Sequence, residues 1–363
     1  MLPSGVNDSP LSRDIARQPA VFDALMARAA EFIALGADRL RPGPGGRLYV
    51  AGCGDGHFAA LACHSHAVAL GLDWRAIGAL DLVLEAQHLS PNDRVIAVSM
   101  SGNVDRTVEA ALAVAAAGVP LVALVNSAQG GRLGQVASAR ISLALDDMAP
   151  FLCGTASYSA SVLALMALAS GAAGAASMPL PGGLRAAMQA AIDRSGVVLE
   201  RLRLPTGVRL LSAGAERGTV AYGAAKLVEL TRIPSWSVDL EEFAHSQYWS
   251  MPASDLVVIV AAHAELARYA DEACSALHAL GVETLAIDTA TSPVPHATHR
   301  ISLPLDSTVA APLVTAIPLQ LLAQSLALRC GLNPDTRVHL KSDATRFQVS
   351  RMLTRRSLLG TGA

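Results

Sequence analysis

The 363-residue sequence predicts an α/β protein built from two tandem domains, each a parallel β-sheet flanked by helices in three αβα layers. Short apolar runs rich in β-branched residues alternate with longer Ala- and Leu-rich stretches of helical period, which is the βαβ pattern. The pattern then returns: "AGCGDG" at 51–56 is echoed by "SAGAERG" at 212–218, and "RISLALDD" at 140–147 by "RISLPLDS" at 300–307. Repeats this far apart indicate duplicated domains rather than a solenoid.

The elements of the first half follow in order. A helix at about 20–36 precedes the loop "RPGPGG". Four apolar runs predict buried parallel strands, at 47–52, 94–99, 120–126 and 140–145. Two stretches between them, 56–71 and 104–118, predict helices. We therefore place a helical arm at 1–45, the first domain at 46–180, the second domain at 190–332 and a C-terminal tail at 333–363.

Composition excludes several classes of protein. The chain is 52% hydrophobic, 16% charged and carries a net charge of -2, so no basic surface for nucleic acid is expected. The five cysteines are scattered and form no C-x-x-C pair, which favours reduced core thiols in a cytoplasmic protein. The N-terminus "MLPSGVNDSPLSRD" lacks the pattern of a signal peptide.

Two uncharged stretches raise the question of a membrane span. No charged side chain lies between Asp147 and Arg185, and the run 307–328 is also uncharged. A span needs about 20 consecutive apolar residues. The first stretch turns into Ala, Gly and Ser halfway along, and Pro312 and Pro318 interrupt the second. We interpret both as buried helices, and expect no membrane contact.

A candidate anion site follows the strand at 94–99. The residues Ser99-Met-Ser101-Gly102-Asn103 lead into a helix, so hydroxyls and backbone N–H groups meet at a helix N-terminus. The alternative is an ordinary helix N-cap, where Ser and Asn are common. The earlier turn with Gly54 and Gly56 fits neither G-x-G-x-x-G nor a Walker motif, so nucleotide binding is unsupported.

A second candidate site is a group of three charged or titratable residues in the second half. Lys226 and Glu229 are three residues apart on a predicted helix and share a face. They are either a surface ion pair or, because the helix is otherwise apolar, buried charges that serve a site. His245 follows sixteen residues later and could be an ordinary surface histidine. The histidines of "HSH" at 64–66 are interpreted as helix side chains rather than metal ligands, and no spacing indicates a metal site.

Together these segments resemble the double sugar-isomerase (SIS) domain family. The chain is similar to the isomerase half of glucosamine-6-phosphate synthase and to stand-alone phosphosugar isomerases and deglycases. The resemblance covers nearly the whole chain, through "GCGDG", "SMSGN", "AAKLVEL", "EEFAH" and "DTRVHLKS". It implies two flavodoxin- or Rossmann-like sheets, no cofactor or metal, a homodimer with shared sites, and a sugar phosphate or amino-sugar phosphate as the ligand.

The resemblance also implies roles for single residues. Glu229 matches the family's proton-transfer glutamate and Lys226 the lysine beside it. His245 matches the ring-opening histidine that reaches a neighbouring subunit's site, and Lys341 matches a tail lysine near the sugar carbonyl. Further positions match sugar or phosphate contacts: Ser99, Ser101, Gly102, Asn103, Gly54, Gly56, Thr155 and Ser157. The implied activity is aldose–ketose isomerisation or amino-sugar-phosphate deamination through an enediol or enediolamine, with no glutaminase domain.

The sequence departs from the family at three positions. Gly56 and Val104 stand where members often carry Ser and Thr hydroxyls for the phosphate, and Ser246 replaces a frequent Gly. Two alternatives therefore stay open. One is a related enzyme acting on an aminosugar without phosphate. The other is a non-catalytic phosphosugar-binding regulator, although such a protein would need only the serine loop.

Overall fold

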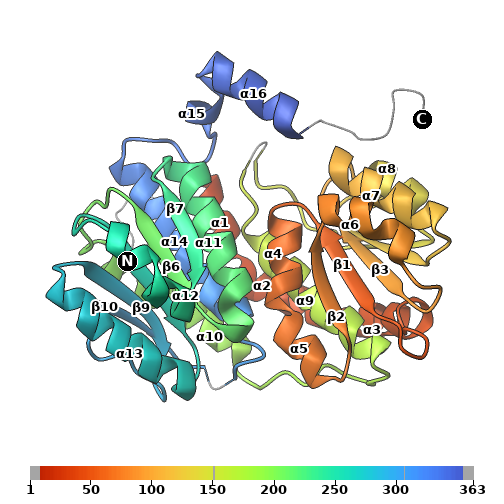
Figure 1. Ribbon diagram of the computed structural model, residues 1–363, viewed down its shortest axis with the longest axis horizontal. Coiled ribbons are helices and arrows are strands. Elements are labelled where there is room, and N and C mark those ends of the chain that lie inside the picture. Colours follow the sequence, from red (N-terminus) through yellow and green to blue (C-terminus); the bar gives the residue numbers. More distant parts are fainter. Residues whose placement is uncertain (1–8, 150–151, 306, 355–363) are drawn as a thin grey trace. The chain divides into compact units, whose positions relative to one another are not determined.

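A computed structural model of the chain describes residues 9–149, 152–305 and 307–354, and contains two five-stranded parallel sheets with helices on their faces (Figure 1). The strand orders are β2-β1-β3-β4-β5 and β10-β9-β8-β6-β7. Numbered within each sheet, both have the order 2-1-3-4-5, so the second sheet repeats the topology of the first. The fold class predicted from the internal repeat is confirmed.

By their contacts the described residues form two compact units. The first-sheet unit comprises 21–146, 157–179 and 340–354. The second-sheet unit comprises 9–20, 147–149, 152–156 and the described residues of 180–339. The domain boundaries proposed from the sequence stay a prediction about which segments fold independently, and the end of the predicted tail, 355–363, lies outside the described residues.

The first sheet is built from the predicted apolar runs and one further strand. Its strands are β1 (Leu48–Gly52), β2 (Trp74–Gly78), β3 (Arg94–Val98), β4 (Leu121–Val125) and β5 (Ala139–Ser142). Residues of β1, β3 and β4 are almost all buried, as expected for a parallel sheet covered on both faces. The edge strand β2 is only partly buried, which explains why its sequence "WRAIG" carries no continuous apolar signal.

Helices cover both faces of this sheet. One face packs on α6 (Ala79–Glu85), α7 (Asp105–Ala116) and α8 (Gly131–Val136), with Ala51, Ala97 and Ala123 in a common core. The crossover from β1 to β2 uses the other face, through α4 (Asp55–Ala62) and α5 (His64–Ala69). The predicted helix at 56–71 is thus two helices. The predicted helix at 20–36 is also divided, into α2 (Gln18–Ala27) and α3 (Ala29–Arg39), after a separate α1 (Pro10–Ala16).

The long uncharged helix α9 (Ala156–Ala172) is buried within the chain. Its glycine at 171 and Gly36 of α3 allow very close contact: a Cβ at Gly36 would lie 2.2 Å from the carbonyl oxygen of Leu168, and one at Gly171 would lie 2.0 Å from that of Ile33. Small residues therefore let the two backbones touch, which confirms the interpretation as a buried helix. None of the helices in the described ranges is long and apolar enough to cross a membrane.

The second sheet has the corresponding elements. Its strands are β6 (Val208–Ser212), β7 (Ser235–Asp239), β8 (Leu256–Ala261), β9 (Glu283–Thr289) and β10 (His299–Leu303). Its helices are α10 (Leu184–Leu199), α11 (Arg217–Thr231), α12 (Leu240–His245), α13 (Ala264–Ala279) and α14 (Pro312–Arg329). Helix α14 is buried along most of its length and starts with Pro312, so the second uncharged stretch is also a buried helix.

Short elements complete the chain. They are η1 (Ala86–His88), η2 (Gly214–Glu216), η3 (Gln247–Ser250), α15 (Val338–Lys341) and α16 (Ala344–Thr354). All five cysteines are free thiols, and three of them are buried, but Cys53 is exposed and Cys330 is half-buried. The expectation that all five are core residues is therefore wrong for Cys53, which lies in the turn directly after β1.

Candidate active site

The pair predicted on α11 forms as the sequence indicates. Lys226 Nζ lies 2.7 Å from Glu229 Oε2. The lysine is only 4% exposed and its ammonium lies 5.5 Å from the ring centre of Tyr222. Since a charged lysine is seldom buried without a purpose or a partner, a surface ion pair does not describe this contact. Glu229 is more accessible, with 26% of its side chain exposed, so a ligand can reach the carboxylate.

A second cation binds the same carboxylate, and the sequence did not reveal it. Arg337, in the segment after α14, makes an ion pair with Glu229 Oε1 through Nη1. Two residues on, His339 Nε2 lies 3.1 Å from the backbone oxygen of Glu229, and Arg232 donates to the carbonyl of His339. The segment was recognised as "DTRVHLKS", but nothing in its pattern says that it folds back onto α11.

His245 ends α12, a different element of the same unit. Asp239 caps this helix by accepting the N–H of Glu241 at 3.0 Å. His245 Nε2 lies 2.9 Å from Glu241 Oε1, one turn earlier, and 69% of the histidine side chain is exposed. The structure thus joins Lys226 and Glu229 and places His245 on an exposed surface. Its ring-opening role in a neighbouring subunit stays a prediction.

The serine loop lies at the carboxyl end of β3 in the first-sheet unit. In a sheet of order 2-1-3-4-5, ligands bind at the carboxyl ends of the strands where the order reverses, here between β1 and β3. The buried Oγ of Ser99 has no hydrogen-bond partner among the described residues. Gly102 has a φ of +66°, and a Cβ there would lie 2.0 Å from the carbonyl oxygen of Gly130. Glycine is therefore required at this turn.

Both backbone N–H groups expected in the anion cradle have partners inside the loop. The N–H of Gly102 donates to the carbonyl of Ser99 at 3.0 Å, and the N–H of Asn103 donates to Ser101 Oγ at 3.1 Å. An anion would have to share or replace these bonds. The buried hydroxyl of Ser99 could bind an anion without displacing such a bond.

Arg132 is a further cation at this loop that the sequence analysis did not select. It donates through Nη2 to the carbonyl of Asn103 at 2.7 Å and makes an ion pair with Asp105, the first residue of α7. A hollow of about 350 Å³ lies here, lined by Asn103, Val104, Asp105, Arg132 and Thr354. The signal that could have found Arg132 is its position after the Gly130-Gly131 turn that follows β4.

The glycine turn after β1 explains one departure from the family. Gly54 has a φ of +54°. A Cβ at Gly56 would lie 2.9 Å from the carbonyl oxygen of Val98 and 3.1 Å from the Val98 side chain. A serine at position 56 would therefore force α4 away from β3. The absence of a serine hydroxyl at position 56 is therefore required by the close packing of α4 against β3.

The remaining predicted residues lie in separate places. Thr155 is 1% exposed, and its hydroxyl bonds to the carboxylate of Asp14, which also accepts the N–H of Ala156 at 3.0 Å. The carbonyl of Ser157 accepts the hydroxyl of Ser161 at 2.7 Å. Lys341 ends α15 and is exposed. The roles of Thr155, Ser157 and Lys341 as sugar contacts stay predictions, and the hydroxyl of Thr155 would first have to leave Asp14.

A buried carboxyl group near the start of α11 was also missed. Glu216 is 1% exposed; its Oε2 accepts the hydroxyl of Thr315 at 2.8 Å, and its Oε1 has no partner among the described residues. Burial raises the pKa of Glu216 to about 7, although the hydroxyl of Thr315 and the nearby hydroxyl of Thr219 act in the opposite direction. At neutral pH a large share of this carboxyl is therefore protonated.

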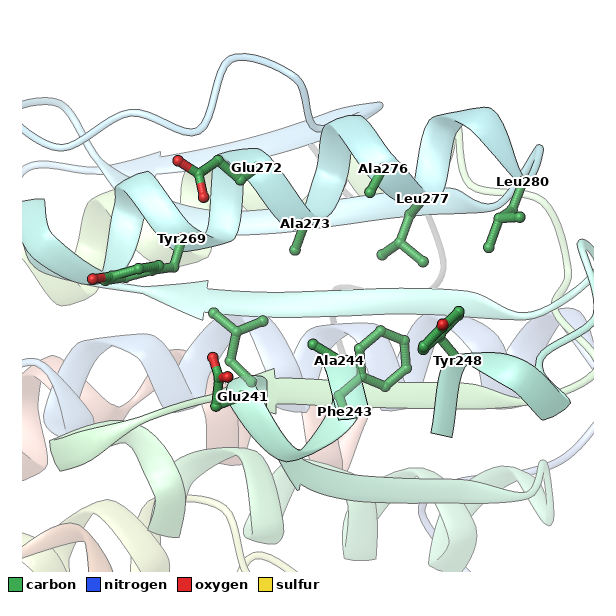
Figure 2. A pocket seen from close by; sticks show the side chains of 11 residues that line it. Glu241, Phe243, Ala244, Tyr248, Tyr269, Glu272, Ala273, Ala276, Leu277 and Leu280 are labelled. Carbon is green, nitrogen blue, oxygen red and sulfur yellow. The ribbon is translucent and has the colours of Figure 1, made fainter. Parts of the chain in front are cut away.

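An apolar hollow of the second-sheet unit lies away from these residues. It has a volume of about 450 Å³ and is bounded by α12, η3 and α13. Figure 2 shows both of its carboxylates, Glu241 and Glu272, near Tyr269, with Tyr248 and Leu280 toward the other end. None of the predicted site residues is among those lining it. In the described part of the chain, no cluster of three His, Cys, Asp or Glu residues is arranged to hold a metal ion.

Solved structures share this fold at low sequence identity. The C-terminal domain of glucosamine-fructose-6-phosphate aminotransferase from Francisella tularensis has a TM-score of 0.76 at 16% identity, covering 90% of this chain and 98% of that chain. Glucosamine-6-phosphate deaminase from Thermotoga maritima has a TM-score of 0.71 at 18% identity, covering 90% and 97%. Tagatose-6-phosphate ketose/aldose isomerase from Escherichia coli has a TM-score of 0.71 at 18% identity, covering 93% and 97%.

No protein-family model and no curated protein sequence matches the chain. At these identities the structural likeness establishes the fold. The resemblance suggested by the sequence motifs, to the isomerase half of glucosamine-6-phosphate synthase and to phosphosugar isomerases, is thus confirmed at the level of the fold and over nearly the whole length of the chain.

Proposed function

We propose that the protein is a sugar-phosphate aldose–ketose isomerase or an amino-sugar-phosphate deaminase that works through an enediol or enediolamine. The observation that carries this proposal is the pairing of Lys226 with Glu229, 2.7 Å apart, on the apolar helix α11. A largely shielded lysine and a reachable carboxylate are the groups that proton transfer beside a carbonyl requires. The names of the solved structures with this fold support the same class of reaction.

The chemistry divides between the two side chains. The Glu229 carboxylate removes a proton from one carbon of the open-chain sugar and returns it to the neighbouring carbon. The Lys226 ammonium stabilises the oxygen that becomes negative in between, and does so more strongly because it is shielded from water. A ring sugar must open first, and we assign that proton movement to His245, since histidine exchanges protons near neutral pH.

We assign phosphate binding to the loop from Ser99 to Asn103. The unpartnered hydroxyl of Ser99 and the guanidinium of Arg132 beside the loop support this assignment. An aminosugar without phosphate remains the second candidate ligand, because Gly56 has no room for a hydroxyl and Val104 offers none. Each lost hydrogen bond to a charged group would weaken binding by about 1.5–3 kcal/mol.

A panel of ligands tests the proposal. Sugar phosphates, amino-sugar phosphates and their unphosphorylated forms are added to the protein, and the melting temperature is measured with each. A ligand that binds only the folded state raises it. Stabilisation by phosphorylated members alone supports the phosphosugar assignment. Stabilisation by unphosphorylated aminosugars, with inorganic phosphate failing to compete, would overturn it.

Measuring turnover distinguishes a non-catalytic sugar-binding regulator from an enzyme. Binding without any conversion of the stabilising ligand would favour the regulator. Conversion by the wild type that is lost in Glu229→Gln would favour the enzyme.

A further inference from the structure

The segment that follows α14 is fixed by a compact turn. Asn333 Oδ1 accepts the N–H groups of Asp335 at 2.9 Å and Thr336 at 3.2 Å, and the backbone N–H of Arg337 donates to the carbonyl of Asn333 at 3.1 Å. Asp335 Oδ1 in turn accepts the N–H of Leu11 at 2.8 Å. These bonds tie the segment to the second-sheet unit and give Arg337 a defined backbone position.

The backbone of Arg337 has a conformation that is rare for arginine. Its φ is +49°, in the left-handed region where residues other than Gly, Asn and Asp are uncommon. Such strain persists where the surroundings impose it, and it is concentrated at functional sites. At Arg337, the strained backbone carries the side chain that meets the candidate base.

The two oxygens of Glu229 are divided between two cations. Lys226 Nζ binds Oε2 at 2.7 Å and Arg337 Nη1 binds Oε1. The exposed fractions are 5% for the Lys226 side chain and 18% for that of Arg337, so water screens both pairs weakly. A carboxylate between two shielded cations is strongly favoured in its charged form.

The other titratable groups around α11 have partners of their own. On β6, Arg209 pairs with Asp255, and on β7, Asp239 pairs with Arg217. Glu216 bonds to Thr315, and Arg329 lies at the exposed end of α14.

Close to Glu229 itself are His339 and Arg232. Burial and then the charges of Arg232 and Arg337 lower the pKa of His339, so its ring is neutral at neutral pH. Glu229 itself makes ion pairs with Lys226 and Arg337.

We propose that Arg337 is a positioning residue for the base. Its guanidinium keeps the Glu229 carboxylate ionised and oriented by binding Oε1, the oxygen that does not contact Lys226. The inference rests on the proton-transfer function proposed above. Each carboxylate oxygen keeps a second lone pair, so an engaged carboxylate still accepts a proton from a substrate carbon. Arginine suits the role because its guanidinium stays charged throughout the physiological pH range.

A double-mutant cycle tests the contact without any substrate. The variants are Arg337→Asn, which removes the guanidinium yet tolerates the left-handed backbone, Glu229→Gln, and the two combined. Equilibrium unfolding at pH 7 should show a coupling of about tenfold in the unfolding constant between the two sites. At a pH where carboxylates are protonated, the coupling should disappear.

Arg232→Asn is the matched control. Arg232 also has a positive φ, of +61°, and lies one turn beyond Glu229, but its guanidinium donates to a backbone carbonyl. In the double-mutant cycle of Arg232→Asn with Glu229→Gln, the effects on the unfolding constant should be additive within about twofold. Additivity for Arg337 as well would overturn the proposal. Because no turnover is measured, that failure is separate from a failure of the proposed enzymatic function.

Kinetics with the ligand found in the panel test the positioning role. Arg337→Gly should lower kcat while KM changes little, and should move the acid limb of the kcat profile upward by about one pH unit or more. Added guanidinium ion should restore part of kcat. A wild-type acid limb, or a lowered kcat that guanidinium leaves unchanged, would show that Arg337 has only a structural role.

Discussion

At the scale of single residues, the proposed proton transfer depends on how one carboxylate and one lysine share a helix face. Lys226 is nearly buried, whereas part of the Glu229 side chain is exposed. The cation of the pair is therefore shielded from solvent, and the carboxylate that would act as the base is accessible to a ligand. The i, i+3 spacing predicted this contact from the sequence. Arg337 could not be predicted, because its pairing depends on how a distant segment folds back onto α11.

Glu229→Gln should keep the fold and ligand binding but lower turnover by at least about 10²-fold, the lower end of what a general acid–base group contributes. The amide oxygen still accepts a hydrogen bond from Lys226, so that lysine is not left without a partner. Turnover and the ligand-induced shift in melting temperature are measured together. Glu265→Gln, an exposed glutamate at the start of α13, is the control and should turn over normally. Near-normal turnover in Glu229→Gln would remove Glu229 from the mechanism.

Glu216 gives the folded state a pH dependence of known sign. Its pKa is raised from 4.5 to about 7, so its contribution to stability is complete below pH 4.5 and is lost as pH rises through 7. The loss amounts to roughly 3 kcal/mol, at about 1.4 kcal/mol for each unit of pKa.

Glu216→Gln should abolish this loss, because the amide stays neutral. Denaturant unfolding at pH 5 and pH 8 measures the difference. Glu272→Gln, at an exposed position, should retain the wild-type pH dependence. An unchanged slope in Glu216→Gln would show that the carboxyl is not held protonated.

At the scale of elements, the first turn of α7 has an unusual cap. Val104 occupies the N-cap with an extended backbone, φ -70° and ψ 113°, but its side chain cannot accept an N–H. Helix α7 therefore starts without a side-chain cap at the edge of the candidate anion site. The sequence showed this position as a departure from the family, and the structure shows which helix it affects.

Val104→Thr should stabilise the fold by about 0.5–2 kcal/mol, because the new hydroxyl can cap α7. If the ligand is a phosphosugar, the same change should lower KM, and Ser101→Ala should raise it. Val104→Ala serves as the control, since it adds no hydroxyl and should do neither. Greater stability with an unchanged KM in Val104→Thr would mean that the hydroxyl caps the helix without meeting a phosphate.

The predictability of the elements follows from their burial. Strands β1, β3 and β4 are buried on both faces and appear in the sequence as unbroken apolar runs. The half-exposed edge strands β2 and β7, "WRAIG" and "SWSVD", give no such signal. The serine loop was found by its residue types, but Arg132 belongs to the next crossover and only the folded sheet brings it there.

At the scale of the whole molecule, the uncharged helix α9 gives no support for a dimer, because it is buried within the chain and packs closely against α3. The expectation of a dimer now rests on His245, whose side chain is 69% exposed at the end of α12, and on the family resemblance.

A mixture of two inactive variants tests whether His245 completes a neighbouring site. Glu229→Gln and His245→Ala proteins are combined and their subunits allowed to exchange. A mixed dimer then contains one site with both residues intact, so activity should return. Glu229→Gln mixed with the double variant is the control and should stay inactive. A monomer in light scattering would contradict shared sites.

Incorporation of deuterium from the solvent tests whether Glu229 transfers a proton between adjacent sugar carbons. The ligands that stabilise the protein are incubated with it in D₂O, and carbon-bound deuterium is followed by NMR. Deuterium should appear at C1 or C2 of at least one phosphosugar with the wild type, and at neither carbon with Glu229→Gln. If every ligand that stabilises the wild type is neither converted nor labelled, Glu229 is not a catalytic base and the protein only binds sugars.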